Sequence, residues 1–429
     1  MTYENARLTS LDRPEQVVCH VDMDCFYAAC ERLREPELRG EPLVVGMGYE
    51  DGETVGAVAT ASYEAREYGV ESAMAISEAL ELLPRRAVSE GDAEATGYYR
   101  PVDMGYYESI SEAVREILQD SADVVREVSI DEAYLDVTEQ VGWEDVEAFA
   151  CDLKRRIEAE VGVAASVGVA PTMSAAKIAS DADKPDGLVV IEPGEVRDFL
   201  APLSVEAVHN VGPVTARELR EMGIETAGDL AASDPDRLAD RFGERGLEIY
   251  RFARGEDARE VTPRDDPKSF SRESAFSEAV SEHETVRERV RTLAAAVADR
   301  ATRENALYQT VGIKVVTPPY DVNTRARSLS GPVDDPDLVE AIALDLLAEF
   351  EDARVRKIGV RVSNLSFTDR EQVSLDGFES DGETDDPGDS GGINERADGE
   401  TDAASDGDEA AMDSGVRSRS GQTTLRDFE

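Results

Sequence analysis

Apolar, β-branched runs alternate with amphipathic helical patterns along this chain, and the alternation ends near residue 368. The nearly continuous apolar run at 17–26 predicts a buried strand, and the pattern at 27–34 predicts a helix after it. Up to residue 190, further strands are predicted at 43–47, 55–60, 123–130, 133–137 and 164–169, and helices at 62–68, 76–83, 103–119, 144–160 and 173–181.

These elements follow a β-α-β-β-α-β order, which is typical of a ferredoxin-like α+β unit. Residues 87–99 are polar and small, and they predict a loop or surface insertion. Residues 203–262 predict short helices joined by short loops. A second mixed unit follows, with strands predicted at 268–277, 308–316, 324–330 and 354–367 and helices at 283–305 and 335–350.

Acidic residues dominate the composition, with 93 Asp and Glu against 45 Lys and Arg and a net charge of −48. Such an excess is typical of disorder, but 41% of the residues are apolar and most of the chain is periodic. Disorder is predicted only for the tract 371–420, which holds sixteen acids and three arginines. A chain of 429 residues predicts two to four domains.

The cations are nearly all arginines, and this ratio of arginine to lysine affects how the acidic surface is interpreted. An acid-rich, lysine-poor surface predicts solubility in concentrated salt, and hence a halophilic cytoplasm. The four cysteines form neither a metal-type spacing nor a disulfide framework, which favours a reducing compartment. No apolar run approaches membrane-spanning length, so a soluble cytoplasmic protein without membrane association is expected. The six lysines are Lys154, Lys177, Lys184, Lys268, Lys314 and Lys357.

Two acidic clusters interrupt predicted strands about a hundred residues apart: Asp22 in the first, and the pair Asp131 and Glu132 in the second. Buried carboxylates are costly unless a cation neutralises them. Clusters from two strands are therefore suited to a two-metal site for phosphoryl or nucleotidyl transfer, with Mg²⁺ as the fitting ion. Neighbours on a regular strand face opposite ways, so both acids reach one site only through a turn or bulge. The competing interpretation is a solvated hairpin tip.

Six segments carry a family resemblance, in this order: VDMDCFYAACE, AVATASYEAREYGV, SIDEAYLDV, SVGVAPTMSAAKIASDADKPDG, VGPVTARELREMGI and RKIGVRVSNL. On the basis of these segments, the chain resembles the Y-family DNA polymerases of the lesion-bypass type. The resemblance covers about residues 15–368 and the last eight residues. The resemblance implies a right-hand architecture. Its parts are a ferredoxin-like palm at 17–190 with small fingers inserted at about 27–99, a helical thumb at 191–262, an α/β little finger at 263–369, a disordered acidic linker at 370–420 and a clamp-binding peptide at 421–429.

The resemblance also implies the roles of the acidic residues. Asp22, Asp131 and Glu132 match the metal carboxylates, and the backbone carbonyl of Met23 is a further ligand, with two Mg²⁺ ions in each active site. Asp24 shares a face with Asp22, yet the family does not use it as a core ligand. The histidines match no catalytic position: His20, His209 and His283.

Substrate contacts follow from the same motifs. Tyr27 matches the steric gate that excludes a 2′-hydroxyl, although a core tyrosine is the ordinary alternative at this position. Tyr63 and Arg66 lie three apart on a predicted helix and so share a face, and the family uses this pair on the incoming triphosphate. Lys184 matches a triphosphate-contacting lysine, and Lys177 is a weaker candidate.

DNA contacts are expected in two places. Residues 208–215 lie where the family carries a helix-hairpin-helix, but Asn210 replaces the first glycine and only Gly212 is left. Arg325 and Arg327 are two apart on a predicted strand and so face one way. We expect them in one basic face with five other cations, although a single arginine is more often simply a solvated surface residue. The other members are Arg272, Lys314, Arg356, Lys357 and Arg361.

The chain ends in QTTLRDFE, which resembles a peptide that binds the sliding clamp PCNA. Leu425 and Phe428 are three apart, so one helical turn would present both to a clamp pocket, and Gln422 would add a hydrogen bond. Glu429 stands where a second aromatic residue is usual. The acidic linker of about fifty residues would span roughly 40 Å as a flexible coil.

The residues and the resemblance together predict a template-directed, low-fidelity DNA polymerase for translesion synthesis in DNA repair. We expect it to act as a monomer on primer–template DNA and deoxynucleoside triphosphates, without a proofreading exonuclease. One alternative is a non-catalytic scaffold that binds the clamp and DNA. The loss of any of the three carboxylates would have favoured this alternative. Another is a palm-type nucleotide cyclase, which would need no thumb, little finger or clamp peptide.

Overall fold

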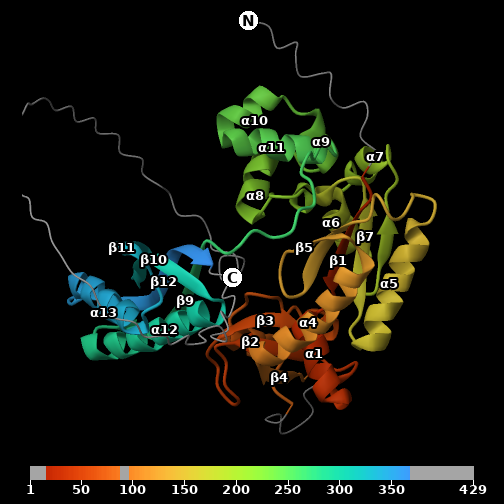
Figure 1. Cartoon of the computed structure of the whole chain (residues 1–429). Helices are drawn as coiled ribbons and strands as arrows, with labels where there is room; N and C mark the ends of the chain where they lie inside the picture. The colour runs from red at the N-terminus through yellow and green to blue at the C-terminus, as the bar shows by residue number, and fades with distance from the viewer. Residues whose placement is uncertain (1–15, 87–95, 368–429) are drawn as a thin grey trace, which may run out of the picture. The chain divides into compact units, whose positions relative to one another are not determined.

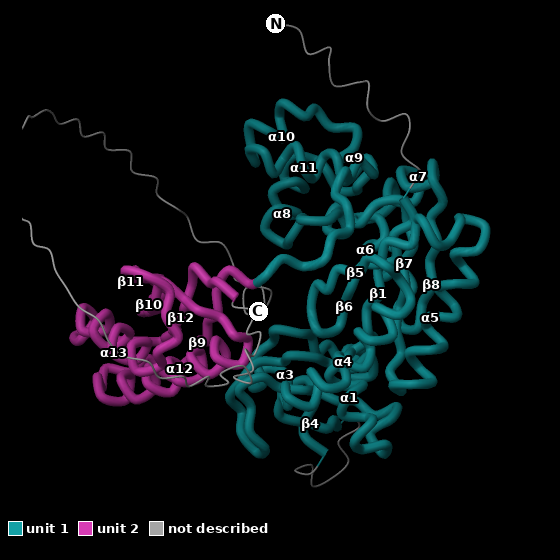
Figure 2. Tube along the Cα trace, viewed as in Figure 1, with its two compact units in different colours: residues 1–266 teal, residues 267–429 magenta. Residues whose placement is uncertain are grey.

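The computed structural model describes residues 16–86 and 96–367. The chain forms two compact units, which divide between residues 266 and 267 (Figure 2). No helix in the described part of the chain is long and apolar enough to cross a membrane.

The first unit is built on a five-stranded sheet in the order β5-β6-β1-β7-β8, with β1 in the middle (Figure 1). β1 runs antiparallel to both of its neighbours. The four strands β5-β6-β1-β7 have the ferredoxin-like order, so this prediction is confirmed. β8 is absent from the prediction because three residues are too few to give a strand pattern. The strands are β1 (Val18–Met23), β5 (Val124–Glu127), β6 (Glu132–Asp136), β7 (Ala165–Ala170) and β8 (Leu188–Val190).

Helices cover both faces of this sheet, and every residue of β1 is buried. On one face, Cys19, Val21 and Met23 pack into a core with α1, α4 and α5. On the other face, α6 lies against β1 and β7 (Figure 1). Because side chains alternate along a strand, His20 and Asp22 face α6. The helices are α1 (Phe26–Arg34), α4 (Met104–Ser121), α5 (Val146–Glu160) and α6 (Met173–Ala182).

The contact between α6 and β7 is unusually close because Gly168 has no side chain. A Cβ atom at this position would lie 2.1 Å from the carbonyl oxygen of Ala176 and 2.2 Å from the backbone nitrogen of Ser180. Both atoms belong to the helix backbone and cannot move away independently. The glycine therefore sets the distance at which α6 presents Lys177 to the sheet.

A small sheet in the order β3-β2-β4, with α2 and α3 beside it, lies within the segment where the fingers are expected. The predicted loop at 87–99 is wrong at its end, because β4 begins at Tyr98 and pairs in parallel with β2. Tyr99 is buried in the core of this small sheet, which explains a strand where the sequence pattern is weak. The elements are β2 (Leu43–Met47), β3 (Ala57–Ala61), β4 (Tyr98–Pro101), α2 (Tyr63–Arg66) and α3 (Ile76–Leu82).

Short helices follow β8, as the pattern over 203–262 predicts. Their apolar residues join one cluster with α6, so this helical part packs on the same side of the palm sheet as the polar face of β1. The helices are α7 (Val196–Leu200), α8 (Pro213–Glu221), α9 (Ala227–Ala232), α10 (Pro235–Phe242) and α11 (Glu244–Ala253). Single 3₁₀ turns occur at Pro36–Leu38, Val205–Ala207 and Ala348–Phe350.

The second unit is a four-stranded antiparallel sheet in the order β11-β10-β12-β9, and α12 and α13 share its core on one face (Figures 1 and 2). We call the other face, which no helix in the described part of this unit covers, the open face. The elements are β9 (Ser269–Val280), α12 (His283–Arg303), β10 (Ala306–Thr317), β11 (Asp321–Val333), α13 (Pro336–Leu347) and β12 (Val355–Phe367).

The close contact at Gly168 gives a stability prediction. Gly168→Ala forces a methyl group into the α6 backbone, so we expect a loss of at least about 2 kcal/mol in the free energy of unfolding. Gly105→Ala is the control, because a Cβ atom there meets nothing closer than 3.9 Å and the change in α4 is neutral or stabilising. Thermal unfolding followed by circular dichroism in molar KCl measures both. Equal melting temperatures for the two variants would contradict the prediction.

Candidate active site

Two of the predicted carboxylates face each other across neighbouring strands. Asp22 on β1 is paired in register with Glu132, the first residue of β6. Asp22 is only 9% exposed, although it carries a carboxylate. A charged pair in this position needs neutralisation, because the sheet is covered on both faces.

Asp131 reaches the same place through a bend. The predicted strand 123–130 is too long, because β5 ends at Glu127 and the chain turns before β6 begins. The backbone nitrogen of Met23 donates to the carbonyl oxygen of Asp131 at 2.8 Å, and the Ser129 hydroxyl donates to the Asp131 carboxylate at 2.5 Å. Burial raises the pKa of Asp131 to about 6, and the charges of Asp22 and Glu132 add to that rise. The turn that the sequence requires for two adjacent acids is therefore present.

Two lysines supply the neutralising charge. The ammonium nitrogen of Lys177, on α6, lies 2.6 Å from Glu132 Oε2 and 3.2 Å from Asp22 Oδ2. The ammonium nitrogen of Lys184 lies 2.7 Å from the other oxygen of Asp22 and 2.7 Å from Asp181. Burial opposes the charge of Lys177, but Asp22, Glu132 and Asp181 outweigh it and raise its pKa.

The donor set suits a divalent cation. In the described part of the chain, no three Asp, Glu, His or Cys side chains are arranged as a ready-made metal site. Instead, Lys177 and Lys184 place positive charge on both oxygens of Asp22. Carboxylate oxygens that require cationic partners are the ligands that Mg²⁺ prefers, so Asp22, Asp131 and Glu132 fit such an ion.

His20 is a site neighbour that the sequence reasoning missed. The ring is fully buried, with Nδ1 2.8 Å from the Ser180 hydroxyl and Nε2 3.4 Å from Glu132 Oε2. The Glu132 carboxylate favours a proton on Nε2, whereas the Ser180 hydroxyl, which donates to the Lys177 carbonyl oxygen at 2.8 Å, favours a proton on Nδ1. Burial lowers the pKa of His20, which favours the neutral ring. Because side chains alternate along a strand, the sequence already placed His20 on the same face as Asp22. This alternation was the signal that could have identified His20 as a neighbour of the site.

Asp24 has a structural part in the site. Its carboxylate accepts hydrogen bonds from the Tyr63 hydroxyl at 3.1 Å, the Ser166 hydroxyl at 2.9 Å and the backbone nitrogen of Asp186 at 2.7 Å. These bonds join β1, α2, β7 and the loop after α6. Both oxygens of Asp24 are engaged with protein donors, and this explains its burial without a metal role.

Tyr63 and Arg66 lie together as their spacing predicts. The Arg66 guanidinium is 4.9 Å from the centre of the Tyr63 ring, and its Nε donates to the carbonyl oxygen of Ala61 at 3.0 Å. Ser62 caps the helix, since its side chain accepts from the Ala65 nitrogen. Tyr63 is bonded to Asp24, so α2 is tied to the strand that carries Asp22.

Tyr27 lies in the first turn of α1 and is half-buried. Its ring stacks on Tyr107 of α4 with the centroids 4.7 Å apart. The Tyr107 hydroxyl donates to the buried Glu31 carboxylate at 2.7 Å. This support fixes the plane of the Tyr27 ring. The adjacent Phe26 is buried in the core.

The helical hairpin has the backbone shape that the sequence suggests. Asn210 has φ of 68°, in the left-handed region that glycine usually occupies. Gly212 is the N-cap of α8 and leaves open space around its Cα. The turn therefore survives the replacement of the first glycine.

The expectation of one basic face on the second unit is wrong. Arg325 and Arg327 pair in register with Ile313 and Val311, which point into the core, so they lie on the helix side of the sheet. There they form ion pairs with Glu349 and with Asp345 of α13. Lys314 lies on the open face.

Arg356, the third predicted DNA contact in this unit, is partly buried. One of its terminal nitrogens is buried without a hydrogen-bond partner. The peptide residues Gln422, Leu425 and Phe428 lie outside the described residues, as does the segment 87–95.

The chain matches two family descriptions: the impB/mucB/samB family over residues 21–181, and the C-terminal domain of that family over residues 267–376. It is 64% identical to DNA polymerase IV of Halobacterium salinarum over 380 residues, which are 89% of this chain and 91% of that protein. It is also 40% identical to DNA polymerase IV of Methanoculleus marisnigri, over 85% of this chain and 98% of the relative.

Solved structures agree with these relatives. The fold is similar to a Y-family DNA polymerase chimera, Dbh-Dpo4(243-245)-Dbh, with a TM-score of 0.71 and 29% identity over 82% of this chain and all of that one. An insertion ternary complex of Dbh DNA polymerase matches with a TM-score of 0.59 and 28% identity over the same shares. The family match over residues 21–181 includes Asp22, Asp131 and Glu132. The chain therefore belongs to the Y family of DNA polymerases, among the DNA polymerase IV enzymes.

Proposed function

We propose that this protein adds deoxynucleotides to a primer end on a DNA template by two-metal nucleotidyl transfer, and copies past damaged bases without proofreading. The observation that carries the proposal is the pairing of Asp22 and Glu132 on one face of the palm sheet, with Asp131 beside them and with Lys177 and Lys184 against the pair. Tyr27 and the α2 pair are tied to the same strand and its following helix.

In this proposal, Asp22, Asp131, Glu132 and the Met23 carbonyl hold two Mg²⁺ ions. Those ions would supply a lowered pKa for the primer hydroxyl and charge neutralisation at the triphosphate. The three carboxylates orient the ions, and the bend at Asp131 lets both neighbouring acids serve. Asp22 would exchange part of its contact with Lys177 and Lys184 for these ions, and the released ammonium groups would contact phosphate oxygens.

The substrate side follows from the positions of the other residues. Arg66 and Lys184 donate to triphosphate oxygens, and Tyr63 holds the helix that carries Arg66 in place. Tyr27, stacked on Tyr107, is the gate against a 2′-hydroxyl. Asp24 keeps β1, α2 and the Lys184 loop in a fixed relation.

We further propose the domain assignment of the sequence analysis, with DNA held by the Gly212 hairpin and by cations of the second unit. The terminal peptide with Gln422, Leu425 and Phe428 would bind a sliding clamp and raise the local concentration of the enzyme at the primer end. The monomeric state and the cytoplasmic location stay predictions from the sequence.

Primer extension in molar KCl with Mg²⁺, on undamaged and abasic templates, tests the activity. We expect the native chain to extend past the abasic site and Asp131→Asn/Glu132→Gln to lose at least about a hundredfold in rate. Glu139→Gln removes an exposed acid from the same unit and should keep full activity. A folded native chain that extends neither template, even with clamp present, would leave the non-catalytic scaffold as the function.

The contact between His20 and Glu132 predicts different outcomes for two amide replacements. The Gln amide nitrogen reaches the position of Nε2, whereas the shorter Asn amide reaches only that of Nδ1. We expect His20→Asn to weaken Mg²⁺ binding at least about tenfold and His20→Gln to stay near the native value. The half-saturating Mg²⁺ concentration and the Mg²⁺-dependent rise in melting temperature measure this. Equal losses in the two variants would show that His20 acts only by packing.

The stack of Tyr27 on Tyr107 predicts sugar discrimination. Tyr27→Ala opens the space under the sugar, so insertion of ribonucleotides should rise by at least about a hundredfold relative to deoxynucleotides. Tyr106→Phe, next to Tyr107 on α4, is the control and should leave the ratio unchanged. Single-nucleotide insertion with matched triphosphates gives the ratio, and no change for Tyr27→Ala would remove the gate from this position.

A further inference from the structure

One carboxylate lies among the cations of the open face. Glu273 on β9 pairs in register with Gly359 on β12, and Gly359 pairs with Lys314 on β10. Directly opposed residues share a face, so these three positions form a row across the sheet. Lys357 is two residues from Gly359 on β12 and faces the same way.

The absence of a side chain at Gly359 lets Glu273 cross the middle strand. A Cβ atom on Gly359 would lie 2.6 Å from Glu273 Cγ, so the acid runs directly over the glycine. Its carboxylate reaches Lys314 at 3.0 Å and Lys357 at 2.5 Å. One acid thus holds two of the six lysines in the chain, and we call these three residues the Glu273 triad.

The triad is partly shielded from solvent. The side chain of Glu273 is 14% exposed, and those of Lys314 and Lys357 are 29% and 25% exposed. Burial disfavours the ionised carboxyl, but the hydrogen bonds from Lys357 and Lys314 prevail and lower its pKa. The carboxylate is therefore ionised at neutral pH and cancels part of the charge of the two lysines.

The second unit as a whole is close to neutral. Residues 267–367 hold fourteen Lys and Arg against sixteen Asp and Glu, a net charge of −2 in a chain of −48. A surface of this unit therefore attracts nucleic acid only where cations gather locally. The open face carries three cations: Lys314, Lys357 and the exposed Arg361. On this face the Glu273 carboxylate stands where a phosphate oxygen would otherwise bind the lysines.

We propose that Glu273 is a built-in counter-ion of the open face: it weakens the binding of DNA phosphates to Lys314 and Lys357 and reduces the dependence of that binding on salt. The inference rests on the proposed function. Cations that bind DNA normally release salt ions from the phosphates, which makes affinity fall steeply with salt concentration. Here a phosphate displaces an internal carboxylate. Each lysine therefore contributes less to the DNA affinity at low salt, and the affinity falls less as the salt concentration rises.

Glu273→Gln tests this with an almost unchanged side-chain shape. We expect the full-length variant to bind a primer–template duplex roughly threefold to tenfold more tightly at the lowest KCl concentration at which it is folded. The slope of log affinity against log KCl concentration should steepen by about 1 to 2, and the two proteins should converge at molar KCl. Fluorescence anisotropy gives the affinities, and melting temperatures confirm folding at each salt concentration.

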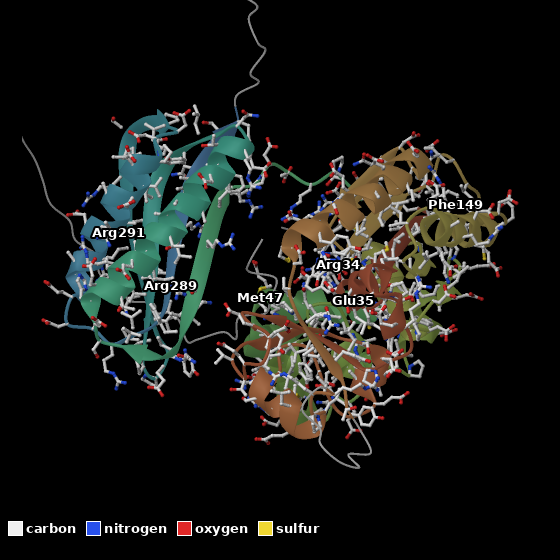
Figure 3. The ribbon with its side chains drawn as sticks, turned by 90° about the horizontal axis from the view of Figure 1, so that it is seen from below. Arg34, Glu35, Met47, Phe149, Arg289 and Arg291 are labelled. Atoms are coloured by element: carbon white, nitrogen blue, oxygen red, sulfur yellow. The ribbon has the colours of Figure 1, made fainter. Side chains whose placement is uncertain are left out.

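Glu284→Gln is the matched control. Glu284 also pairs with two cations, Arg287 and Arg291, but it lies on α12, on the helix side of the sheet, where Arg291 is labelled in Figure 3. The Glu284→Gln substitution changes the net charge by the same amount. The slope of log affinity against log KCl concentration should stay as in the native chain. Adding Lys314→Gln and Lys357→Gln to Glu273→Gln should remove the gain.

The outcomes separate the two proposals. If the native chain binds primer–template DNA but Glu273→Gln matches Glu284→Gln, the counter-ion role is wrong and the proposed function stands. Weaker binding by Glu273→Gln would also overturn the inference, because it would show that the acid positions the lysines for phosphate. A native chain that binds no primer–template DNA at any salt concentration would defeat the proposed function itself.

Discussion

The active-site region depends on how buried carboxylates are neutralised. Asp22 and Glu132 face each other within a sheet that helices cover on both sides, and Lys177 on α6 bridges them. Without that ammonium group, two carboxylates would share a site of low polarity, at a cost of several kcal/mol. The position of α6 against the sheet is thus an electrostatic requirement as well as a packing one.

Several small features serve this requirement. Gly168 lets α6 approach β7 closely enough for Lys177 to reach both acids. Asp24 ties the strand of Asp22 to α2 and to the loop that carries Lys184. The bend before β6 brings Asp131 close enough to Asp22 and Glu132 for their charges to raise its pKa. In the proposed mechanism these residues would form a preorganised set of ligands, in which a divalent ion would replace existing positive charge with little rearrangement of the protein.

Charge is balanced locally elsewhere in the chain too. Arg325 and Arg327, which spacing alone placed on a DNA-binding surface, are paired with acids on the helix side of their sheet. The Glu273 triad repeats this pattern on the open face. In the described part of this acid-rich chain, many cations have a nearby carboxylate. According to our proposals, the cations that bind phosphate are those whose internal pairs can be exchanged. Salt then screens both the internal ion pair and the phosphate contact that replaces it, which suits a protein that works at high ionic strength.

The sequence by itself determined the order and kind of most elements, because apolar periodicity reports which side of a strand or helix is buried. It also identified Asp22, Asp131 and Glu132 as candidates, because acids in apolar strands are rare without a cation. Only the tertiary structure decided which partners they have: the bridging Lys177 comes from α6, and His20 approaches Glu132 from the neighbouring strand. Strand pairing likewise put Arg325 on the opposite face from Lys314. Spacing along one strand fixes which residues share a face, but the face itself is chosen by long-range packing, and no local pattern contains that information.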